Sequence, residues 1–385
     1  MDLKKKKLAV KYMLITIIIF ILILGLLIFV HEFGHFIIAK KLGVRVEEFG
    51  FGYPPRIFGK KVKGTIYSLN WIPFGGFVKI YGEDGDGKKD KKSFVSRKIW
   101  QRTLMIIAGV TMNFLLAAML LGLGHGLGLP SPAEENYSSN AKIGQSRIQI
   151  LQVATKSPAE NSGILAGDVI LEMRHINGSC GCQGQIQTLM PKNVSEVQDF
   201  ISQHKGQEII LKIMRGKEIL EIQTMPRENP PNDEGAMGVA LSATVMVSYP
   251  WYTALFYGFK TAFNLTIAIV MAIADLLWRL LSGAGSQAAA GIAGPVGVYV
   301  LTGQMVKLGF VYLLQFTALL SLNLMIVNIL PFPALDGGRL LFLLVEKING
   351  KPISAKVERL VHSIGFVLLI ILMLAITVRD IIKWF

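Results

Sequence analysis

Five apolar stretches divide the chain, and two long polar inserts lie between them. The apolar stretches cover residues 13–39, 103–128, 254–282, 310–330 and 363–378, and the polar inserts cover residues 40–102 and 140–228. No charged side chain occurs within residues 13–30, and an uncharged run of about 18 residues is long enough to cross a bilayer as a helix. The pattern predicts a polytopic α-helical membrane protein.

Composition supports this class. Of the 385 residues, 52% are hydrophobic and only 17% are charged, with a mean hydropathy of +0.48, which argues against a disordered chain or a soluble enzyme. The net charge of +14 is typical of nucleic-acid binding, but in a membrane protein basic residues lie beside the anionic cytoplasmic leaflet. We therefore predict the lipid bilayer as a partner and no nucleic acid.

Basic residues also indicate the topology. The Lys4 to Lys7 run before the first apolar stretch imitates a secretory signal peptide, but no small-residue cleavage site follows. We interpret the stretch as a retained transmembrane helix. The insert 40–102 is richer in Lys and Arg than the N-terminal tail, so the positive-inside rule places the insert in the cytoplasm of a cell-membrane protein. The first helix then runs from outside to inside.

The insert 140–228 alternates short apolar runs with turn signals, as small β-rich domains do. It resembles a bacterial PDZ domain, which implies an extracytoplasmic site for a peptide or a substrate ectodomain. The resemblance rests on four short motifs: Ser157-Pro158-Ala159, Gly163-Ile164, Gly167-Asp168-Val169-Ile170 and Ile176-Asn177-Gly178. An insertion at 179–192 departs from the compact PDZ pattern. We interpret its two cysteines, Cys180 and Cys182, as ordinary loop residues, because a C-x-C pair lacks the spacing of a structural zinc site.

The motif His31-Glu32-Phe33-Gly34-His35 carries the first sign of chemistry. Two histidines at i and i+4 of a helix can bind one metal ion while Glu32 points to the adjoining face. A pair of packing histidines is the plainer alternative, but ionisable groups in a membrane helix are costly and usually functional. Nine residues, or about 13 Å of helix, separate His31 from Lys40. The predicted metal site therefore lies in the bilayer, nearer its cytoplasmic side.

A catalytic zinc usually takes three protein ligands, and the candidates for the third are Asp275, Asp336 and His362. Asp336 follows an apolar helix that Pro331 and Pro333 interrupt at membrane depth, where broken backbone is tolerated only beside protein or a water-filled cavity. A simple turn at Asp336 is the alternative, and it is weaker because it leaves a charge unpaired near hydrocarbon. Asp275 is better explained as the partner of Arg279, and His362 as an interfacial residue.

Together these motifs resemble the site-2 protease family of intramembrane zinc metalloproteases, in its bacterial PDZ-containing branch. The HEFGH motif is similar to the family's H-E-x-x-H, and residues 328–337 are similar to its N-x-x-P-x-P-x-L-D-G. The resemblance implies Zn²⁺ held by His31, His35 and Asp336, with Glu32 as the catalytic base. It also implies a set of substrate-binding residues, namely Asn328, Gly75, Gly76, Phe77, Val78 and Asn113. Residues 291–297 and 108–113 resemble two further family segments, and one PDZ stands where some relatives have two.

This interpretation divides the chain into four regions. We expect residues 1–139 to hold two core helices and a cytoplasmic β-hairpin, 140–228 the PDZ domain, 229–300 a linker with a peripheral or re-entrant segment, and 301–385 the last two core helices. Segment 254–282 contains Lys260, Asp275 and Arg279, which disfavour a lipid-facing crossing. A full crossing would also put Asp336 at the outer end of its helix, away from His31.

The expected activity is hydrolysis of transmembrane helices in membrane proteins, such as trimmed anti-sigma factors or leftover signal peptides. Within residues 65–81 we expect a hairpin in which 66–69 and 77–80 flank a turn at 73–76 and pair with unwound substrate. A loop that only anchors the basic insert is the alternative. The PDZ domain is expected to filter substrates by size or, alternatively, to bind a new C-terminus. A metal transporter and a catalytically inactive PDZ adaptor remain rival functions.

Overall fold

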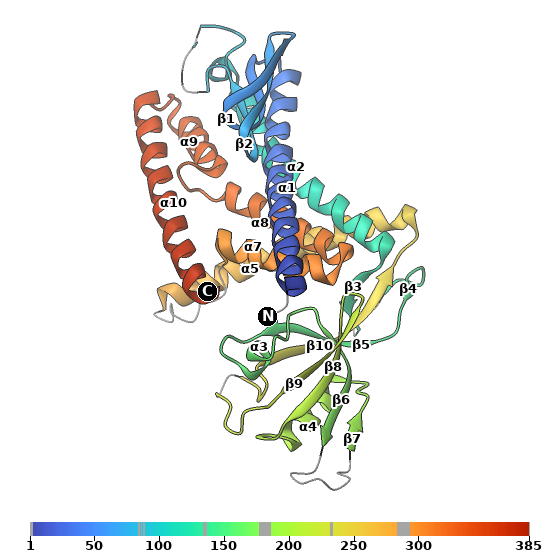
Figure 1. Ribbon diagram of the computed structural model, residues 1–385. Helices are drawn as coiled ribbons and strands as arrows, with labels where there is room; N and C mark the ends of the chain where they lie inside the picture. Colours follow the sequence, from blue (N-terminus) through green and yellow to red (C-terminus); the bar gives the residue numbers. More distant parts are fainter. Residues whose placement is uncertain are drawn as a thin grey trace. The chain divides into compact units, whose positions relative to one another are not determined.

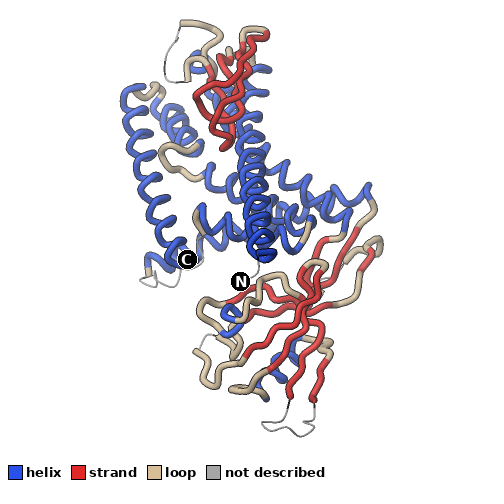
Figure 2. Tube along the Cα trace, in the orientation of Figure 1, coloured by secondary structure: helices blue, strands red, loops and turns tan. Residues whose placement is uncertain are grey.

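The computed structural model describes residues 3–83, 85, 87, 89–133, 137–176, 186–231, 234–282 and 293–384. Figures 1 and 2 show its helices and strands. Backbone contacts divide the chain into two compact units, each described by itself. The first unit comprises 1–121, 257–302 and 316–385, and the second comprises 122–256 and 303–315.

Within the described part of the chain, five helices are long and apolar enough to cross a membrane, as judged by length and composition. They are Val10–Lys41, Ile99–Leu127, Trp251–Arg279, Phe310–Ile329 and Ala355–Ile382. Each overlaps one of the five apolar stretches of the sequence, which confirms the prediction of a polytopic membrane protein. A β-rich region, inserted after the second of these helices, completes the architecture.

The first unit is built around the long helix α1. Its elements are α1 (Leu3–Lys41), β1 (Val46–Val62), β2 (Thr65–Ile80), the 3₁₀ turn η1 (Phe94–Ser96), α2 (Ile99–Leu127), α5 (Trp251–Leu281), α7 (Pro295–Leu308), α8 (Phe310–Ile329), α9 (Asp336–Asn349) and α10 (Ala355–Trp384), of which α2, α5, α7 and α8 also extend into the second unit. The β1–β2 hairpin lies along the C-terminal half of α1 (Figure 1). Aromatic side chains hold it there, with ring centroids 5.4 Å apart for Phe29 and Phe49 and 4.7 Å apart for Phe36 and Phe49.

Two glycines let α1 and α2 cross closely. A Cβ atom on Gly34 would lie 2.7 Å from the carbonyl carbon of Ala108, and one on Gly109 would lie 2.8 Å from Cε1 of His31. Real Cβ atoms do not approach other atoms so closely, so the absence of a side chain at both positions sets the helix separation. The crossing lies at the level of the HEFGH motif.

The hairpin pairs differently from expectation. Residues 66–69 and 76–80 of β2 do not pair with each other, because residues 46–51 of β1 lie between them: Phe49 pairs with both Tyr67 and Val78. The turn of the hairpin is at Lys63-Gly64, both with positive φ, while β2 bends at Gly75 (φ +99). The expected turn at 73–76 is therefore wrong, and that bend instead brings the end of β2 to the other edge of β1.

The break between α8 and α9 follows the two prolines. Helix α8 ends at Ile329, and α9 begins at Asp336. Gly337 and Gly338 in its first turn are buried against backbone carbonyl groups of residues 329–332, where a Cβ atom would collide. The Asp-Gly-Gly sequence therefore permits the chain to fold back tightly and start a helix within one turn.

The second unit contains an eight-stranded sheet with strand order β3-β10-β5-β6-β8-β9, in which β4 pairs with β10 and β7 with β6. Its elements are β3 (Leu129–Pro132), β4 (Lys142–Ile143), β5 (Arg147–Val153), α3 (Pro158–Asn161), β6 (Val169–Ile176), β7 (Ile186–Leu189), α4 (Val194–Gln203), β8 (Ile209–Arg215), β9 (Glu218–Thr224) and β10 (Val239–Ser248). Gly163 and Gly167 have positive φ, as their predicted turns require. Asp168, which directly follows Gly167, is fully buried and pairs with Arg215 at 2.6 Å.

Some sequence expectations lie outside the described residues. These are Asn177, Gly178, the first half of the 179–192 insertion with Cys180 and Cys182, and the first two residues of 291–297. The described end of that last segment is anchored, because the buried Asp380 of α10 accepts a hydrogen bond of 2.7 Å from the Gly297 N–H.

Helix α5 keeps its charges at the surface. Asp275 and Arg279 form an exposed ion pair at 2.8 Å, which confirms the interpretation of Asp275 as the partner of Arg279. In Figure 1, α5 runs across the direction of α1. Its length and composition are compatible with a membrane span, and the prediction that it does not fully cross stays a prediction.

We expect Gly34→Ala to lower stability by about 1–3 kcal/mol, the usual cost of overpacking a core, because the new methyl group meets the backbone of Ala108. The matched control is Gly25→Ala on the same helix, where the Cβ would make an ordinary contact of 3.5 Å with Phe51. Thermal unfolding in detergent measures both. Equal midpoints for the two variants would contradict the role given to Gly34.

Candidate metal centre

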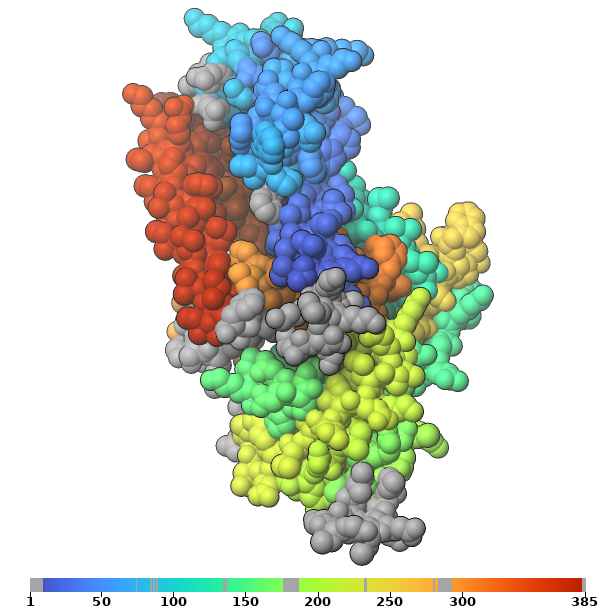
Figure 3. Space-filling model, viewed as in Figure 1, coloured from blue at the N-terminus to red at the C-terminus, as the bar shows by residue number. Residues whose placement is uncertain are grey.

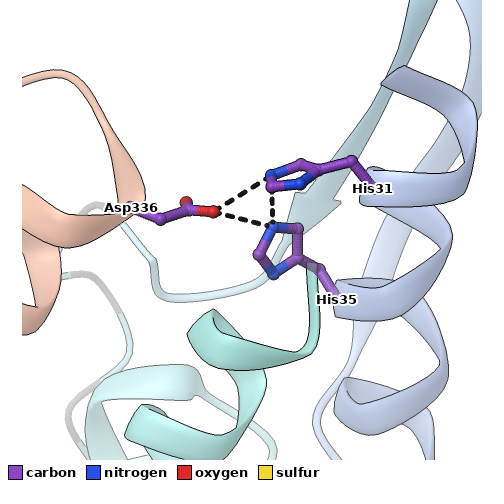
Figure 4. Close-up of side chains that lie close together, drawn as sticks. All are labelled: His31, His35 and Asp336. Atoms are coloured by element: carbon purple, nitrogen blue, oxygen red, sulfur yellow. Dashed lines mark hydrogen bonds and ion pairs between the residues drawn. The ribbon is translucent and has the colours of Figure 1, made fainter. Parts of the chain in front are cut away.

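His31 and His35 lie one helical turn apart on the same face of α1, and both are buried. Their Nε2 atoms are 3.2 Å apart, with the rings in an edge-to-face arrangement. Figure 4 shows both Nε2 atoms turned toward the carboxylate of Asp336. The i, i+4 spacing in the sequence thus produces the juxtaposition that it predicts.

Asp336 reaches this pair from the first turn of α9. Its Oδ2 atom lies 3.0 Å from Nε2 of His31 and 3.4 Å from Nε2 of His35. Among the described residues these three form the one group of His, Cys, Asp or Glu side chains whose ligand atoms all lie within 4.8 Å of one another. The structure brings in Asp336, and neither Asp275 nor His362, as the third member.

A stripe on α2 holds the two imidazoles in orientation. Residues 105, 109 and 113 are spaced by four along the helix and face α1 together. The Nδ1 atom of His35 donates to the Met105 carbonyl at 2.8 Å, Gly109 leaves room for both rings, and the Asn113 carboxamide lies 3.3 Å from Nδ1 of His31. Anchoring Nδ1 leaves Nε2 as the nitrogen that can bind a metal.

Asn113 was expected to contact substrate, yet its side chain is fully buried against His31. Its Oδ1 atom has no hydrogen-bond partner among the described residues. Rotating the carboxamide by half a turn lets Oδ1 accept the Nδ1 proton of His31 and leaves the Nε2 lone pair free. In this position Asn113 can fix the orientation of the His31 ring.

The group fits a divalent metal such as zinc. Two imidazole nitrogens and one carboxylate oxygen are the donor types that catalytic zinc sites use, with a further position open for water. Two acceptor nitrogens and a carboxylate gathered within a few ångströms in a buried place also require a cation or protons between them.

Glu32 lies beside this group without joining it. Its Oε2 atom accepts a hydrogen bond of 3.1 Å from the backbone N–H of Val78 in β2. Glu32, His35 and Asp336 line a common cavity of about 610 Å³ together with Phe77 and Val78. Burial, together with the nearby negative charge of Glu32, raises the pKa of Tyr53 on the hairpin.

The remaining expected residues divide into two sets. Phe77 and Val78 line the cavity. Gly75 and Gly76 are buried instead, and Cβ atoms there would lie 2.7 Å from Ile28 and 2.8 Å from the Gly50 carbonyl oxygen. Asn328 lies half-buried in the last turn of α8, apart from the cavity lining. The two glycines therefore shape the bend of β2 rather than face the cavity.

Sequence reasoning missed several groups. The Met105 carbonyl cannot be seen in a side-chain pattern, and Gly109 was noted only as part of a family segment. Two ion pairs near the cavity were also missed: the buried Arg102 pairs with Glu346 at 2.9 Å, and Arg339 pairs with Glu83. The available signal was Arg102, which directly precedes the apolar stretch 103–128, because a charge buried there usually has a partner.

Comparison with known proteins gives one family. The profile described as Peptidase family M50 matches residues 19–372. A Clostridium perfringens protein named as a zinc metalloprotease is 36% identical over 369 residues, which cover 95% of this chain and 98% of the relative. A Fusobacterium nucleatum protein with the same description is 31% identical over 377 residues, covering 96% and 99%. The regulator of sigma-W protease RasP of Bacillus subtilis is 29% identical over 451 residues, again covering 96% and 99%.

We expect Asp336→Ala to weaken zinc binding by at least about 100-fold, more than the loss of an outer-shell partner costs, because it removes one of three converging donors. Asp275→Ala is the matched control, since it deletes the same carboxylate from an exposed ion pair. Metal content and chelator competition on the purified chains provide the measurement. Unchanged affinity in Asp336→Ala would exclude it as a ligand.

Proposed function

The chain belongs to peptidase family M50, and on that premise we propose that it hydrolyses peptide bonds within transmembrane segments of other membrane proteins. It is a zinc-dependent metalloprotease. The observation that carries the proposal is the gathering of His31, His35 and Asp336 beside Glu32 in a cavity that borders β2. We assign the first three residues as zinc ligands and Glu32 as the catalytic base.

The chain's own groups account for the proton transfers. Bound zinc would supply a Lewis acid that acidifies water and polarises the scissile carbonyl. Glu32 takes the proton of the attacking water and passes it to the leaving amine. The Nδ1 contacts with Met105 and Asn113 keep both histidines oriented throughout, so no ligand needs to move during turnover.

The substrate is proposed to bind as an added strand on β2. Peptide bonds of a membrane helix are closed by internal hydrogen bonds, so the helix must unwind locally before attack. The end of β2 pairs with β1 on one side, and Phe77, Val78 and Ile80 line the cavity. The Val78 N–H donates to Glu32 in this structure. When substrate binds, it would donate to a substrate carbonyl instead. A hairpin that only anchors the insert is the alternative.

The geometry also supports the proposed topology. Asp336 and His31 share one depth, because their side chains are 3.0 Å apart. With the basic insert in the cytoplasm, α1 ends there, and α8 must likewise approach the cytoplasm where it ends near Asp336. Helix α8 then starts outside, so α5 begins and ends on the outer side. We therefore propose that α5 is peripheral or re-entrant and that the active site lies in the bilayer toward the cytoplasm.

The β-rich unit is proposed to be an extracytoplasmic PDZ domain that filters substrates. A domain joined to the core helices on the outer side would exclude bulky ectodomains, so only shortened substrates would pass. A peptide dock is the alternative: β10 pairs with β3 and β4 only over residues 244–248, so among the described strands residues 239–242 have one free edge that a peptide could extend.

Substrates of this kind are trimmed anti-sigma factors or leftover signal peptides. One relative, RasP of B. subtilis, carries the name regulator of sigma-W protease, which favours the first class. The rival functions have less support. A transporter would need several scattered polar sites, whereas the described residues hold one metal-type group. An inactive adaptor would lack a ligand or the base.

Glu32→Gln should keep its zinc and lower cleavage of a model membrane helix by about 100-fold or more, since the amide cannot accept the proton of water. Glu47→Gln on the hairpin is the matched control, where the half-buried carboxylate pairs with the exposed Lys79. Cleavage and metal content are measured on the same preparations. Parental cleavage by a zinc-loaded Glu32→Gln chain would disprove the base assignment.

Val78→Pro should lower cleavage about fivefold, the effect of one backbone hydrogen bond of about 1 kcal/mol, and leave zinc content unchanged. Proline removes the N–H that faces Glu32 and the proposed substrate strand. The control is Ile57→Pro in the outer half of β1, where the side chain is 53% exposed. If both variants cleave at the parental rate, strand addition has to be abandoned.

Replacing residues 142–248 by a short linker should permit cleavage of untrimmed substrates if the PDZ unit is a filter. The deletion extends to Ser248 because β10 completes the sheet. Rates for a trimmed and an untrimmed version of one membrane protein are compared. Slower cleavage of both would favour the peptide dock over the filter.

A further inference from the structure

Helix α10 contacts the loop that directly precedes Asp336. The two contacts lie one turn apart: His362 accepts a hydrogen bond of 2.9 Å at Nδ1 from the backbone N–H of Ala334, and Gly365 packs against Pro333, with a hypothetical Cβ atom only 2.7 Å from the proline carbonyl oxygen. Ala334 lies two positions before Asp336, and Pro333 lies three positions before it. Otherwise α10 packs sparsely, because only 6% of its most apolar 18-residue stretch is buried.

The contacted backbone is in a conformation that needs support. Ala334 has φ +76, in the left-handed region that residues with a side chain seldom occupy and that persists only where the surroundings hold it. The chain must turn there, because α8 ends at Ile329 and Gly337 is already pressed against the α8 carbonyls. The Ala334 N–H is the donor that His362 fixes.

The hydrogen bond also sets the state of the imidazole. An Nδ1 atom that accepts from a backbone N–H carries the ring proton on Nε2, so His362 is the neutral Nε2–H tautomer. Phe342 of α9 packs on the same ring at 5.4 Å. A histidine in this tautomer cannot offer Nε2 to a metal, which agrees with its absence from the His31–His35–Asp336 group.

We infer that His362 is a positioning residue for the metal site: through Ala334 it holds the 330–335 loop in the turn that aims Asp336 at His31 and His35. This inference rests on the proposed zinc site and deepens it. Figure 3 shows α10 (red) and the β1–β2 hairpin (blue) on either side of a recess, and both line the cavity. The helix that borders the substrate cavity therefore also helps to set the metal affinity.

The test measures zinc affinity by chelator competition, independently of cleavage. His362→Leu removes the acceptor and should weaken zinc binding about tenfold, the lower end of the effect of outer-shell partners. His362→Asn should stay within about threefold of the parental affinity, because its Oδ1 can occupy the place of Nδ1 and accept from Ala334. Thermal unfolding in detergent checks that each variant is folded.

A double variant tests the route through Ala334. Glycine adopts positive φ without strain, so Ala334→Gly in the His362→Leu background should recover affinity to within about threefold of the parental value. Parental affinity in His362→Leu, or no recovery in the double variant, would overturn the inference. A separate result would contradict the proposed zinc site itself. If Asp336→Ala binds zinc as tightly as the parental chain, the site is wrong, whatever the variants at position 362 show.

Discussion

The closest approach of α1 to α2 determines the geometry of the whole site. Gly34 meets the carbonyl of Ala108 and Gly109 meets both imidazoles, so the helices are separated by backbone alone at the level where the histidines lie. At any larger separation, the Met105 carbonyl would lose its 2.8 Å contact with His35. In a bilayer such close packing is the main source of helix association, because lipid chains are as apolar as leucine. The same contact thus provides stability and ligand orientation.

Charge burial explains why the site needs so many elements. A carboxylate and two imidazoles next to hydrocarbon are costly unless they are paired, and the chain brings them together from α1 and α9, with α2 holding the rings. The supporting charges are paired in the same way: Arg102 with Glu346, and Arg339 with Glu83. Both pairs involve α9, so the helix that begins with Asp336 is fixed by ion pairs as well as by the His362 contact at its preceding loop.

Sequence reasoning found the parts of the molecule that depend on local pattern. The five apolar helices, the i, i+4 histidines and the helix break at Pro331 and Pro333 all follow from periodicity or from backbone chemistry within a few residues. The cost of an unpaired charge singled out Asp336 from its two alternatives. Its distance from His31 could not be predicted, because that distance depends on how helices about 300 residues apart in the chain pack together.

The pairing of β2 shows where such reasoning ends. Alternation and the Gly75-Gly76 pair predict two short strands around a turn, but local pattern does not reveal that β1 inserts between them. β1 pairs with one edge of residues 76–80, and on their other side the Val78 N–H donates to Glu32 at the cavity. On the proposed mechanism, a carbonyl group of a substrate strand that adds to β2 must replace the Glu32 carboxylate as the acceptor of this N–H. On the proposed mechanism, binding of an extended substrate and release of the base are then a single exchange of hydrogen bonds.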